Sequence, residues 1–469
     1  MTRTRNAGVN TSGLPDEALD YLLERLGRTR ESVGRFVIPE AEHDVRRPVL
    51  VERLDHHYSH ACTAFLSSPF SKATIVVIDE DAPKVSVWKG EADAVERIEW
   101  PWRGLGFTDI HRTCASIFGF DDVAGEARLE ALARLGSPVQ KDLGDWSLDR
   151  DADSLRLRAN WVSEIEAALT ADPRTDGVPA GAAVAGAVEG QLCTLLERLL
   201  VAVQRRVPSE CLCLAGSFFN NSAINSAVRR AGVFNRVFVP VNPGNGGLAV
   251  GAALAASRCR PRPLSPFLGP TYEPDEIKAT LDNCKVQYDW MTEDGVIDLA
   301  VASLRRGHLV GWFSGGMEWG PRALGARSIL ANPFAPYVLE NLNRFLKHRA
   351  PWRGYGLSAP EEAVREHFDG PCCSPFMECD YHPRRPEVFR SVLPSPDAAV
   401  RIQTVGAMAP ARFRRLLDAF GAATGLPFLV NTSFNGFREP LVCTPADAVR
   451  VFYGTGMDVL ALDRFVLAK

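Results

Sequence analysis

Two consecutive units in the middle of the chain constrain its fold most. Each is a short apolar run followed by a glycine turn and a helical pattern: ECLCLAGSFFNNSAINSAVRRAG (210–232) and RVFVPVNPGNGGLAVGAALAA (236–256). Units of this kind are typical of α/β proteins, in which helices cover a sheet, and here they predict a largely parallel sheet. Ligands of such sheets bind at the carboxyl ends of the strands, where these glycine turns lie.

The chain is long enough for more than one domain. It has 469 residues, and SRCRPRPLSPFLGPTY (257–272) carries a cluster of prolines that is typical of a linker. Strand and helix patterns resume after it. We therefore expect a first domain over residues 1–257, a linker over 258–272 and a second α/β domain over 273–469.

Composition excludes several classes of function. Hydrophobic residues make up 46% and charged residues 23% of the chain, as in globular proteins with large cores, and the net charge of -4 does not favour nucleic acid as a partner. No apolar run is long enough to span a membrane. The eleven cysteines are irregularly spaced, which favours reduced thiols over disulfides or a zinc site. We expect a soluble, cytoplasmic protein.

The segment GGMEWGPRALGARS (315–328) has the features of an anion site. It places Arg322 and Arg327 five positions apart on a turn framed by glycines and Pro321, with Ser328 beside the second arginine. We predict that this turn opens a helix whose amides face an anion, while the guanidinium groups bind its oxygens by forked hydrogen bonds. Phosphate is the favoured anion. The alternative is an ordinary solvated surface with capping residues.

The same half of the chain repeats this chemistry elsewhere. Several basic side chains together favour a polyphosphate or an acyl phosphate as the ligand. The further candidates are Lys347, Arg349, Arg353, Arg401, Asn431, Ser433 and Asn435.

The segment HHYSH (56–60) is a candidate metal site in the first half. His56 and His60 lie one turn apart if the segment is helical, and the apolar run ATIVVID ends in Asp79. Two histidines and one carboxylate form a set of ligands suited to Fe(II) or a similar divalent ion. A histidine pair without a metal is the alternative that the spacing leaves open.

The second half resembles a known family. GWFSGGMEWGPRALGARSIL, VRIQTV, TGLPFLVNTSFN and EPLVCTPADAVRVFYGTGMDVLAL are similar to motifs in the carboxy-terminal, YrdC-like domain of O-carbamoyltransferases, which modify antibiotics and nodulation factors. The resemblance implies that this domain binds carbamoyl phosphate and ATP with Mg²⁺, makes carbamoyl adenylate and releases pyrophosphate. The residues implied to neutralise the phosphates are Arg322, Arg327, Lys347, Arg349 and Arg401, and those implied to help hold the ligands are Ser328, Asn431, Ser433 and Asn435.

The first half resembles the amino-terminal domain of the same family. HHYSHACTAF, LCLAGSFFNN and GNGGLAVGAA are similar to its motifs, and the resemblance implies an actin/Hsp70-like ATPase fold that passes the carbamoyl group to a hydroxyl. It also implies that His56, His60 and Asp79 bind the metal, Fe(II) in particular. The residues implied to hold the adenylate are Gly216, Asn221, Gly244, Asn245 and Gly246.

Departures from the family pattern concentrate in the first half. Asn245 stands where the family has an aspartate ligand, Ser217 replaces a glycine, and Glu130 with Ala131 replaces Met-Gly. The start, MTRTRNAGVNTSGLP, resembles a stretch that lies further into the family's chains. We therefore expect a first domain without its first hairpin, through either an upstream start codon or a genuinely reduced domain.

Three readings of function follow. The leading one is an ATP-dependent transferase that moves a carbamoyl group from carbamoyl phosphate to a small hydroxylated metabolite in natural-product tailoring, with a homodimer as one option for its assembly. The second is an enzyme that forms carbamoyl adenylate but serves a different acceptor. The third is a non-catalytic, nucleotide-binding homologue. The identity of the acceptor is left open by the sequence.

Overall fold

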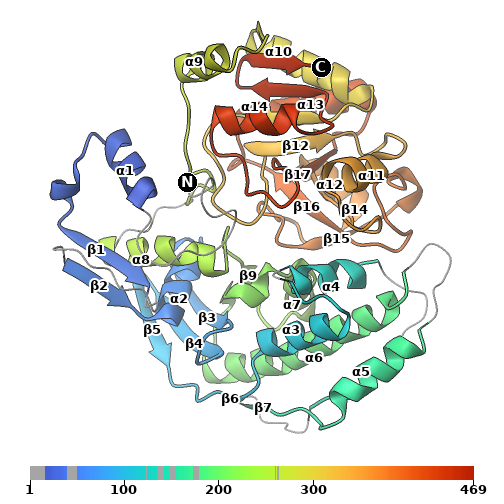
Figure 1. The fold of residues 1–469 in the computed structure, drawn as a ribbon. Helices are drawn as coiled ribbons and strands as arrows, with labels where there is room; N and C mark the ends of the chain where they lie inside the picture. The colour runs from blue at the N-terminus through green and yellow to red at the C-terminus, as the bar shows by residue number, and fades with distance from the viewer. Residues whose placement is uncertain are drawn as a thin grey trace.

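The computed structural model describes residues 16–39, 50–122, 124–135, 142–147, 154–172, 179–258, 260 and 263–469. Its strands form one five-stranded sheet in the first half and one ten-stranded sheet in the second, and helices pack against both (Figure 1). The predicted α/β fold class is confirmed. The two large sheets share no strand, although the predicted domain boundaries themselves remain predictions.

The five-stranded sheet has the order β5-β4-β3-β8-β9. Its strands are β3 (Lys72–Ile78), β4 (Val85–Glu91), β5 (Ala94–Ile98), β8 (Cys211–Ala215) and β9 (Arg236–Phe238). The predicted largely parallel sheet is wrong here, because β3, β4 and β5 pair antiparallel and only β3, β8 and β9 pair parallel. Short turns join β3 to β4 and β4 to β5, and strands joined in this way run antiparallel.

Strand β3 is buried on both faces, which explains its continuous apolar sequence. Val76 and Ile78 belong to the core cluster that includes α3, α4 and α6, whereas Ile75 and Val77 belong to the cluster that includes α2 and α8. The helices of this half are α1 (Asp16–Arg25), α2 (His56–Leu66), α3 (Phe107–Ile117), α4 (Gly125–Ala133), α5 (Trp161–Thr170), α6 (Ala182–Arg206), α7 (Ser222–Ala231) and α8 (Leu248–Ser257).

The ten-stranded sheet is mixed, with the order β10-β19-β18-β11-β12-β17-β13-β16-β15-β14. Only the pairs β11–β18 and β13–β16 are parallel. Its strands are β10 (Asp289–Trp290), β11 (Val310–Phe313), β12 (Arg327–Ala331), β13 (Gly356–Pro360), β14 (Phe368–Asp369), β15 (Asp380–Pro383), β16 (Val400–Val405), β17 (Leu429–Ser433), β18 (Val459–Leu462) and β19 (Phe465–Ala468).

Two separate cores flank this second sheet, and neighbouring residues of one strand alternate between them. Ile329 belongs to one core and Leu330 to the other. The helices are α9 (Pro274–Cys284), α10 (Glu293–Arg305), α11 (Val338–Glu340), α12 (Glu361–His367), α13 (Ala411–Thr424) and α14 (Pro445–Tyr453). Thr444 caps α14 by accepting a hydrogen bond from the Asp447 amide, and Pro445 follows at the first helical position.

The predicted helix at GPRALGARS is wrong. Residues 314–326 form a loop that leads directly into β12. The Glu318 carboxylate fixes the loop, since its Oε1 accepts hydrogen bonds from the amides of Leu324, Ala326 and Arg327 at 2.8, 3.0 and 3.2 Å. The Glu318 carboxylate therefore occupies three backbone amides of the segment that was predicted to bind an external anion.

The remaining elements of the first half are short. β1 (Arg35–Pro39) and β2 (Leu50–Leu54) pair parallel in a two-stranded sheet, and β6 (Arg103–Gly104) pairs with β7 (Ser154–Leu155). The stretch MTRTRNAGVNTSGLP, on which the predicted loss of a hairpin rests, lies outside the described residues. Among the described helices, none combines the length and the apolar character that crossing a membrane requires.

Candidate active site

His56, His60 and Asp79 meet at one end of the central strand β3. Asp55 caps α2 by accepting a hydrogen bond from the Tyr58 amide at 2.7 Å, so the helix begins at His56 and His60 follows one turn later. The Nε2 atoms of His56 and His60 lie 2.8 and 3.0 Å from Asp79 Oδ2. The potential ligand atoms of these three residues all lie within 4.8 Å of one another.

The surroundings of this cluster suit a divalent cation in part. His60 and Asp79 are buried, whereas Asn245 is exposed and places its Oδ1 3.3 Å from His60 Nε2. An amide oxygen there can add a ligand but no negative charge. His60 Nδ1 is buried and, among the described residues, has no hydrogen-bond partner, so the second nitrogen lacks the usual orienting group. The donor set fits a cation bound by two imidazoles and one carboxylate.

The glycine turns beside this cluster have a packing role of their own. Gly216 has φ +101°, and a Cβ at this position would lie 1.9 Å from the Ile78 carbonyl oxygen. A Cβ at Gly244 would lie 2.9 Å from Asn220 Nδ2, and a Cβ at Gly246 would lie 2.4 Å from Asn242 Nδ2. The predicted adenylate contacts of these glycines stay predictions.

Both polar atoms of the Asn221 side chain form hydrogen bonds within the protein. Its Oδ1 accepts hydrogen bonds from the Ala223 and Ile224 amides at the start of α7, and its Nδ2 donates to both oxygens of Glu189, at 3.1 and 3.0 Å. The side chain thus caps a helix and orients a buried carboxylate. These contacts account for the asparagine without a ligand, and its predicted nucleotide contact stays a prediction.

Three arginines of the second half, Arg322, Arg353 and Arg401, lie close enough to affect one another's pKa and form an arginine belt that faces the first half. Arg322 donates to the Asn220 carbonyl at 3.0 Å, which links the two halves directly. The pKa of Arg401 lies well below its ordinary value, because burial and then the Arg322 and Arg134 charges disfavour its charged form. Burial, and next the Arg349 charge, lower the pKa of Arg353 to about 10. Positive groups gathered without enough acids favour an anionic ligand.

Arg401 has a buried guanidinium nitrogen that no described acceptor satisfies. Its Nη1 is buried and, in the part of the chain that the structure describes, forms no hydrogen bond. Arg401 and Arg134 line the same small cavity of about 20 Å³. A buried guanidinium nitrogen without an acceptor is costly, so an oxyanion at this position would stabilise it.

Lys347 lies at the other end of the belt with Ser433 and Asn435. Its Nζ donates to the Ser433 carbonyl at 2.6 Å and to Asn435 Oδ1 at 2.5 Å. Burial lowers the pKa of Lys347 to about 7, and the Arg349 charge contributes to the same shift. Ser328 pairs directly with Ser433 across β12 and β17, so their side chains point to the same face. The structure therefore brings these predicted site residues together.

Arg349 and Asn431 each make polar contacts within the second half. Arg349 stacks on the Tyr355 ring at 4.0 Å and donates from Nε to Asn343 Oδ1. Asn431 donates to Ser358 Oγ at 2.9 Å, while its Oδ1 is buried without a partner among the described residues.

Arg327 does not lie beside Arg322, although the sequence predicts that the two clamp one anion. Its guanidinium group donates to the carbonyls of Gly315, Ala326 and Pro270 at 3.0, 3.0 and 2.9 Å. The same group lies 3.5 Å from the centre of the Phe313 ring. In this conformation Arg327 holds the loop together, and of these two arginines it is Arg322 that faces the first half.

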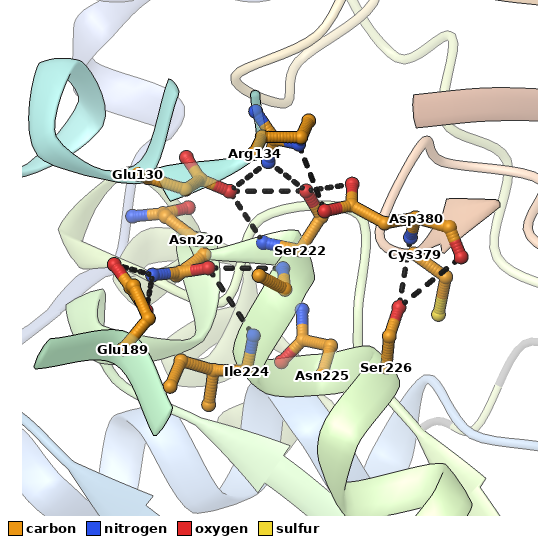
Figure 2. A network of polar contacts seen from close by, with 12 residues as sticks. Glu130, Arg134, Glu189, Asn220, Ser222, Ile224, Asn225, Ser226, Cys379 and Asp380 are labelled. Carbon is orange, nitrogen blue, oxygen red and sulfur yellow. Dashed lines mark hydrogen bonds and ion pairs between the residues drawn. The ribbon is translucent and has the colours of Figure 1, made fainter. Parts of the chain in front are cut away.

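Sequence reasoning missed a buried polar network that joins the halves. Arg134, at the end of α4, donates to Asp380 Oδ2 at 2.8 Å and pairs with Glu130 at 2.5 Å (Figure 2). Ser222 at the start of α7 donates to Asp380 Oδ1 at 2.7 Å and lies 3.0 Å from Glu130 Oε1. No motif signals this network, since the segment with Glu130 and Arg134 meets Ser222 and Asp380 from two distant parts of the sequence.

A cavity of about 350 Å³ lies between the two groups of candidate residues. Ser217 and Thr108 line it on the side of the metal cluster, where Ser217 N donates to Asp79 Oδ1 and Thr108 Oγ1 to the Asp79 carbonyl. Arg322 lines it on the side of the arginine belt, and His111 lines it as well. The cavity is large enough for a small polar metabolite.

The chain matches two family descriptions that together span most of its length. Residues 16–254 match the Carbamoyltransferase N-terminus and residues 301–469 match the Carbamoyltransferase C-terminus. The chain belongs to the carbamoyltransferase family. The predicted resemblance to O-carbamoyltransferases and the predicted enzyme class are thereby confirmed.

Individual relatives agree with this family. The carbamoyltransferase chain is 31% identical to an uncharacterized protein of Synechocystis sp., over 88% of this chain and 76% of that protein. It is 34% identical to nodulation protein NolO of Bradyrhizobium diazoefficiens, over 55% of this chain and 49% of the relative. It is 29% identical to nodulation protein NolNO of Sinorhizobium fredii, over 90% of this chain and 64% of the relative. The chain thus spans about half to two thirds of the length of these two nodulation proteins.

Similarity to solved structures is weaker. An activator of 2-hydroxyisocaproyl-CoA dehydratase from Clostridium difficile with bound ADPNP aligns with the carbamoyltransferase chain at a TM-score of 0.35 and 17% identity, over 52% of this chain and 81% of that one. HypF from T. kodakarensis aligns at a TM-score of 0.36 and 13% identity, over 52% of this chain and 43% of that one. Scores at this level do not establish a shared fold, so the actin/Hsp70-like and YrdC-like folds stay predictions.

Proposed function

We propose that this protein transfers a carbamoyl group from carbamoyl phosphate, by way of an ATP-dependent carbamoyl adenylate, to a hydroxyl of a small metabolite in natural-product tailoring. The observation that carries the proposal is the convergence of Arg322, Arg353 and Arg401 on the first half, with Arg401 Nη1 buried and, among the described residues, without an acceptor. Such a group is the counterpart of several phosphate oxygens.

Charge neutralisation explains how this belt would promote the first step. Carbamoyl phosphate and ATP repel each other, and fixed guanidinium groups offset this repulsion without rearranging during the reaction. Arg322 and Arg401 would bind phosphate oxygens, and Lys347 with Arg349 would extend the positive region. Ser328, Ser433 and Asn435 would orient the ligand through neutral hydrogen bonds. Arg327 would act indirectly, by fixing the loop that carries Arg322.

The second step belongs to the other side of the cavity. His56, His60 and Asp79 would hold a divalent cation, for which Fe(II) is the favoured ion, and such a cation polarises an oxygen ligand as a Lewis acid. Ser217 would keep the Asp79 carboxylate oriented through the hydrogen bonds to Oδ1. Gly216 and Gly244–Gly247 would leave room for the adenylate, with Mg²⁺ accompanying ATP in the first step.

Two observations favour a second candidate function. Asn245 brings no charge to the cluster, and His60 Nδ1 lacks an orienting partner among the described residues. A weakened metal site fits an enzyme that makes carbamoyl adenylate in its second half and serves a different acceptor.

The proposal for the leading function also includes a cytoplasmic location and a homodimeric state.

Pyrophosphate release tests the first step. The full-length protein with ATP, Mg²⁺ and carbamoyl phosphate should release pyrophosphate, and Arg401→Met should lower the rate by about 10²-fold because a preplaced charge is lost. Arg305→Met, at the exposed end of α10, is the matched control and should keep the full rate. Unchanged release in Arg401→Met, or none from the folded wild type, would contradict the proposal.

A further inference from the structure

A buried histidine–glutamate pair at the wall of the cavity has no part in the proposed function. His111 on α3 is 4% exposed and Glu189 on α6 is 6% exposed, and His111 Nε2 lies 3.0 Å from Glu189 Oε1. His111 lines the cavity that Arg322 and Ser217 also line. A buried ionisable pair is costly to keep, so its place at a ligand-sized cavity calls for a chemical reason.

The hydrogen bonds around Glu189 determine the tautomer of His111. Asn221 Oδ1 accepts from two amides, which turns its Nδ2 toward Glu189, where it donates to both carboxylate oxygens. Glu189 therefore acts only as an acceptor. His111 Nε2 must carry the proton in the bond to Glu189, and the Nδ1 of the neutral ring keeps its lone pair. Among the described residues, this Nδ1 has no hydrogen-bond partner.

The other titratable groups of the cavity wall are already engaged. Glu80 and Glu126 both pair with Arg112, and Glu130 pairs with Arg134. These carboxylates accept hydrogen bonds from arginines and are therefore occupied. Of the ionisable groups that the structure describes on this wall, His111 alone keeps an unengaged basic nitrogen.

The charges that face His111 make its imidazole a stronger base. Burial lowers the pKa of His111, but the charge and hydrogen bond of Glu189 on α6, followed by the charges of Glu126 and Glu130 on α4, raise it above the ordinary value on balance. Phe218 packs its ring edge to face with the imidazole at 6.2 Å and adds no charge. Arg112, next to His111 on α3, is occupied by Glu80 and Glu126.

We infer that His111 Nδ1 accepts the proton of the acceptor hydroxyl during carbamoyl transfer, and that Glu189 is the residue that positions and stabilises the imidazole. This inference rests on the proposed function. The acceptor oxygen forms a bond to the carbamoyl carbon while its proton passes to Nδ1. The bond between that carbon and the phosphate oxygen breaks, and the leaving phosphate group takes the electron pair. The imidazolium then returns its proton to solvent, so no further reactant is needed.

The tautomer can be tested without any substrate. Two-bond ¹H–¹⁵N spectra of histidine-labelled, full-length protein should show His111, assigned by its loss in His111→Gln, with the proton on Nε2 in its neutral form. Its pKa should lie above that of an ordinary histidine and should fall in Glu189→Gln. A neutral form protonated on Nδ1 would overturn the inference, whether or not the protein has activity.

Kinetics test the chemistry. We use glycerol as the probe acceptor, and water in a parallel reaction without glycerol. In both reactions the ratio of AMP release to pyrophosphate release should fall about 10²-fold in His111→Gln. In Glu189→Gln the rise of AMP release with pH should shift to lower pH, because the base loses its raised pKa. His367→Gln changes a half-buried histidine of the second half that also has a glutamate neighbour, and should leave the ratio unchanged.

These outcomes distinguish a failure of the inference about His111 from a failure of the proposed carbamoyl transfer. A normal ratio in His111→Gln, with pyrophosphate release intact, would overturn the inference and leave the proposed function standing. Absence of pyrophosphate release from the wild type would reject the adenylate route instead. The tautomer measurement then decides the inference about His111.

Discussion

At the residue scale, the two carboxylate oxygens of Asp79 serve different partners. Its Oδ2 faces His56 and His60, while its Oδ1 accepts hydrogen bonds from the amide and the hydroxyl of Ser217. Burial raises the pKa of Asp79, but the bonds from His56, His60 and Ser217 outweigh it and hold the pKa below its ordinary range. The serine that replaces a family glycine is thus part of the site.

Removing the charge of Asp79 should remove the metal. We expect wild-type protein reconstituted with Fe(II) to retain about one ion per chain, and Asp79→Asn to retain far less, because an amide replaces the buried carboxylate that faces both histidines. Elemental analysis after desalting measures this. Asp93→Asn, in the exposed turn between β4 and β5, is the control. Equal metal content in the two variants would argue against the cluster as a cation site.

Lys347 should link anion binding to proton uptake. With a pKa of about 7 it is mostly neutral at pH 8, and a bound phosphate favours its charged form, so ATP binding at this pH should take up as much as about one proton. Titration calorimetry in buffers of different ionisation enthalpy measures the uptake. Lys347→Arg should abolish it, since arginine stays charged, whereas the exposed Lys278→Arg should not. Uptake that persists in Lys347→Arg would place the titrating group elsewhere.

The depressed pKa of Lys347 also has a consequence for stability. Between about 7 and the ordinary lysine value of 10.5, the unfolded chain holds a proton that the folded chain has lost. The free energy of unfolding contributed by this residue therefore rises with pH across that window, and the cost of burying the charged amine is greatest below pH 7.

At the scale of elements, the approach of β8 to β3 depends on a glycine. Gly216 follows β8 with a positive φ, and its amide donates to the Pro243 carbonyl at 2.7 Å. Its Cα lies so close to the end of β3 that a side chain would meet the Ile78 carbonyl. The turn therefore sets the distance between the end of β3, where Asp79 lies, and the segment that carries Ser217.

Substitution of this glycine should be costly. Gly216→Ala should lower the free energy of unfolding by about 2–4 kcal/mol, through an unfavourable φ and a clash with backbone. Gly190→Ala is the matched control, because Gly190 lies within α6 with open space at its Cβ position and should gain about 0.5–1 kcal/mol. Denaturant unfolding measures both. A Gly216→Ala protein as stable as the wild type would contradict this packing of β8 against β3.

At the scale of the whole molecule, buried charges hold the two halves together. Arg134 and Glu130 come from the first half and Asp380 from the second, and the Ala399 amide donates to the Arg134 carbonyl at 3.1 Å. Burial raises the pKa of Glu130, but the charges of Arg134, Arg401 and Arg322 outweigh it, so the net pKa is lowered. Stability from this group is present above the ordinary glutamate pKa and is lost as the pH falls below it.

Breaking the contact between the halves should destabilise the protein markedly. Asp380→Asn should cost about 3–5 kcal/mol, because it leaves the Arg134 charge buried without its full partner set. Asp369→Asn breaks the exposed pair with Arg384 and should cost less than about 1 kcal/mol. Calorimetry of both variants measures the difference and shows whether the halves still unfold together. Similar losses in both variants would contradict the role of the buried pair.

Much of the local structure could be predicted from the sequence, because burial leaves a periodic pattern along the chain. The apolar run of β3, the long helix α6 and the helical spacing of His56 and His60 follow from such patterns. The predicted helix at GPRALGARS is an exception, because this segment forms a loop that leads into β12. The pattern does not say which strands pair, so it does not predict the antiparallel pairing of β3, β4 and β5.

The sequence by itself therefore determined the α/β class, the family and the set of candidate side chains. The tertiary structure decided what each of these side chains meets. Arg327 reaches the Pro270 carbonyl 57 positions away, and His111 reaches Glu189 78 positions away. Local preference is set by neighbours along the chain, whereas the partner of a charge is set by whatever distant backbone or carboxylate the folded core brings within hydrogen-bond distance.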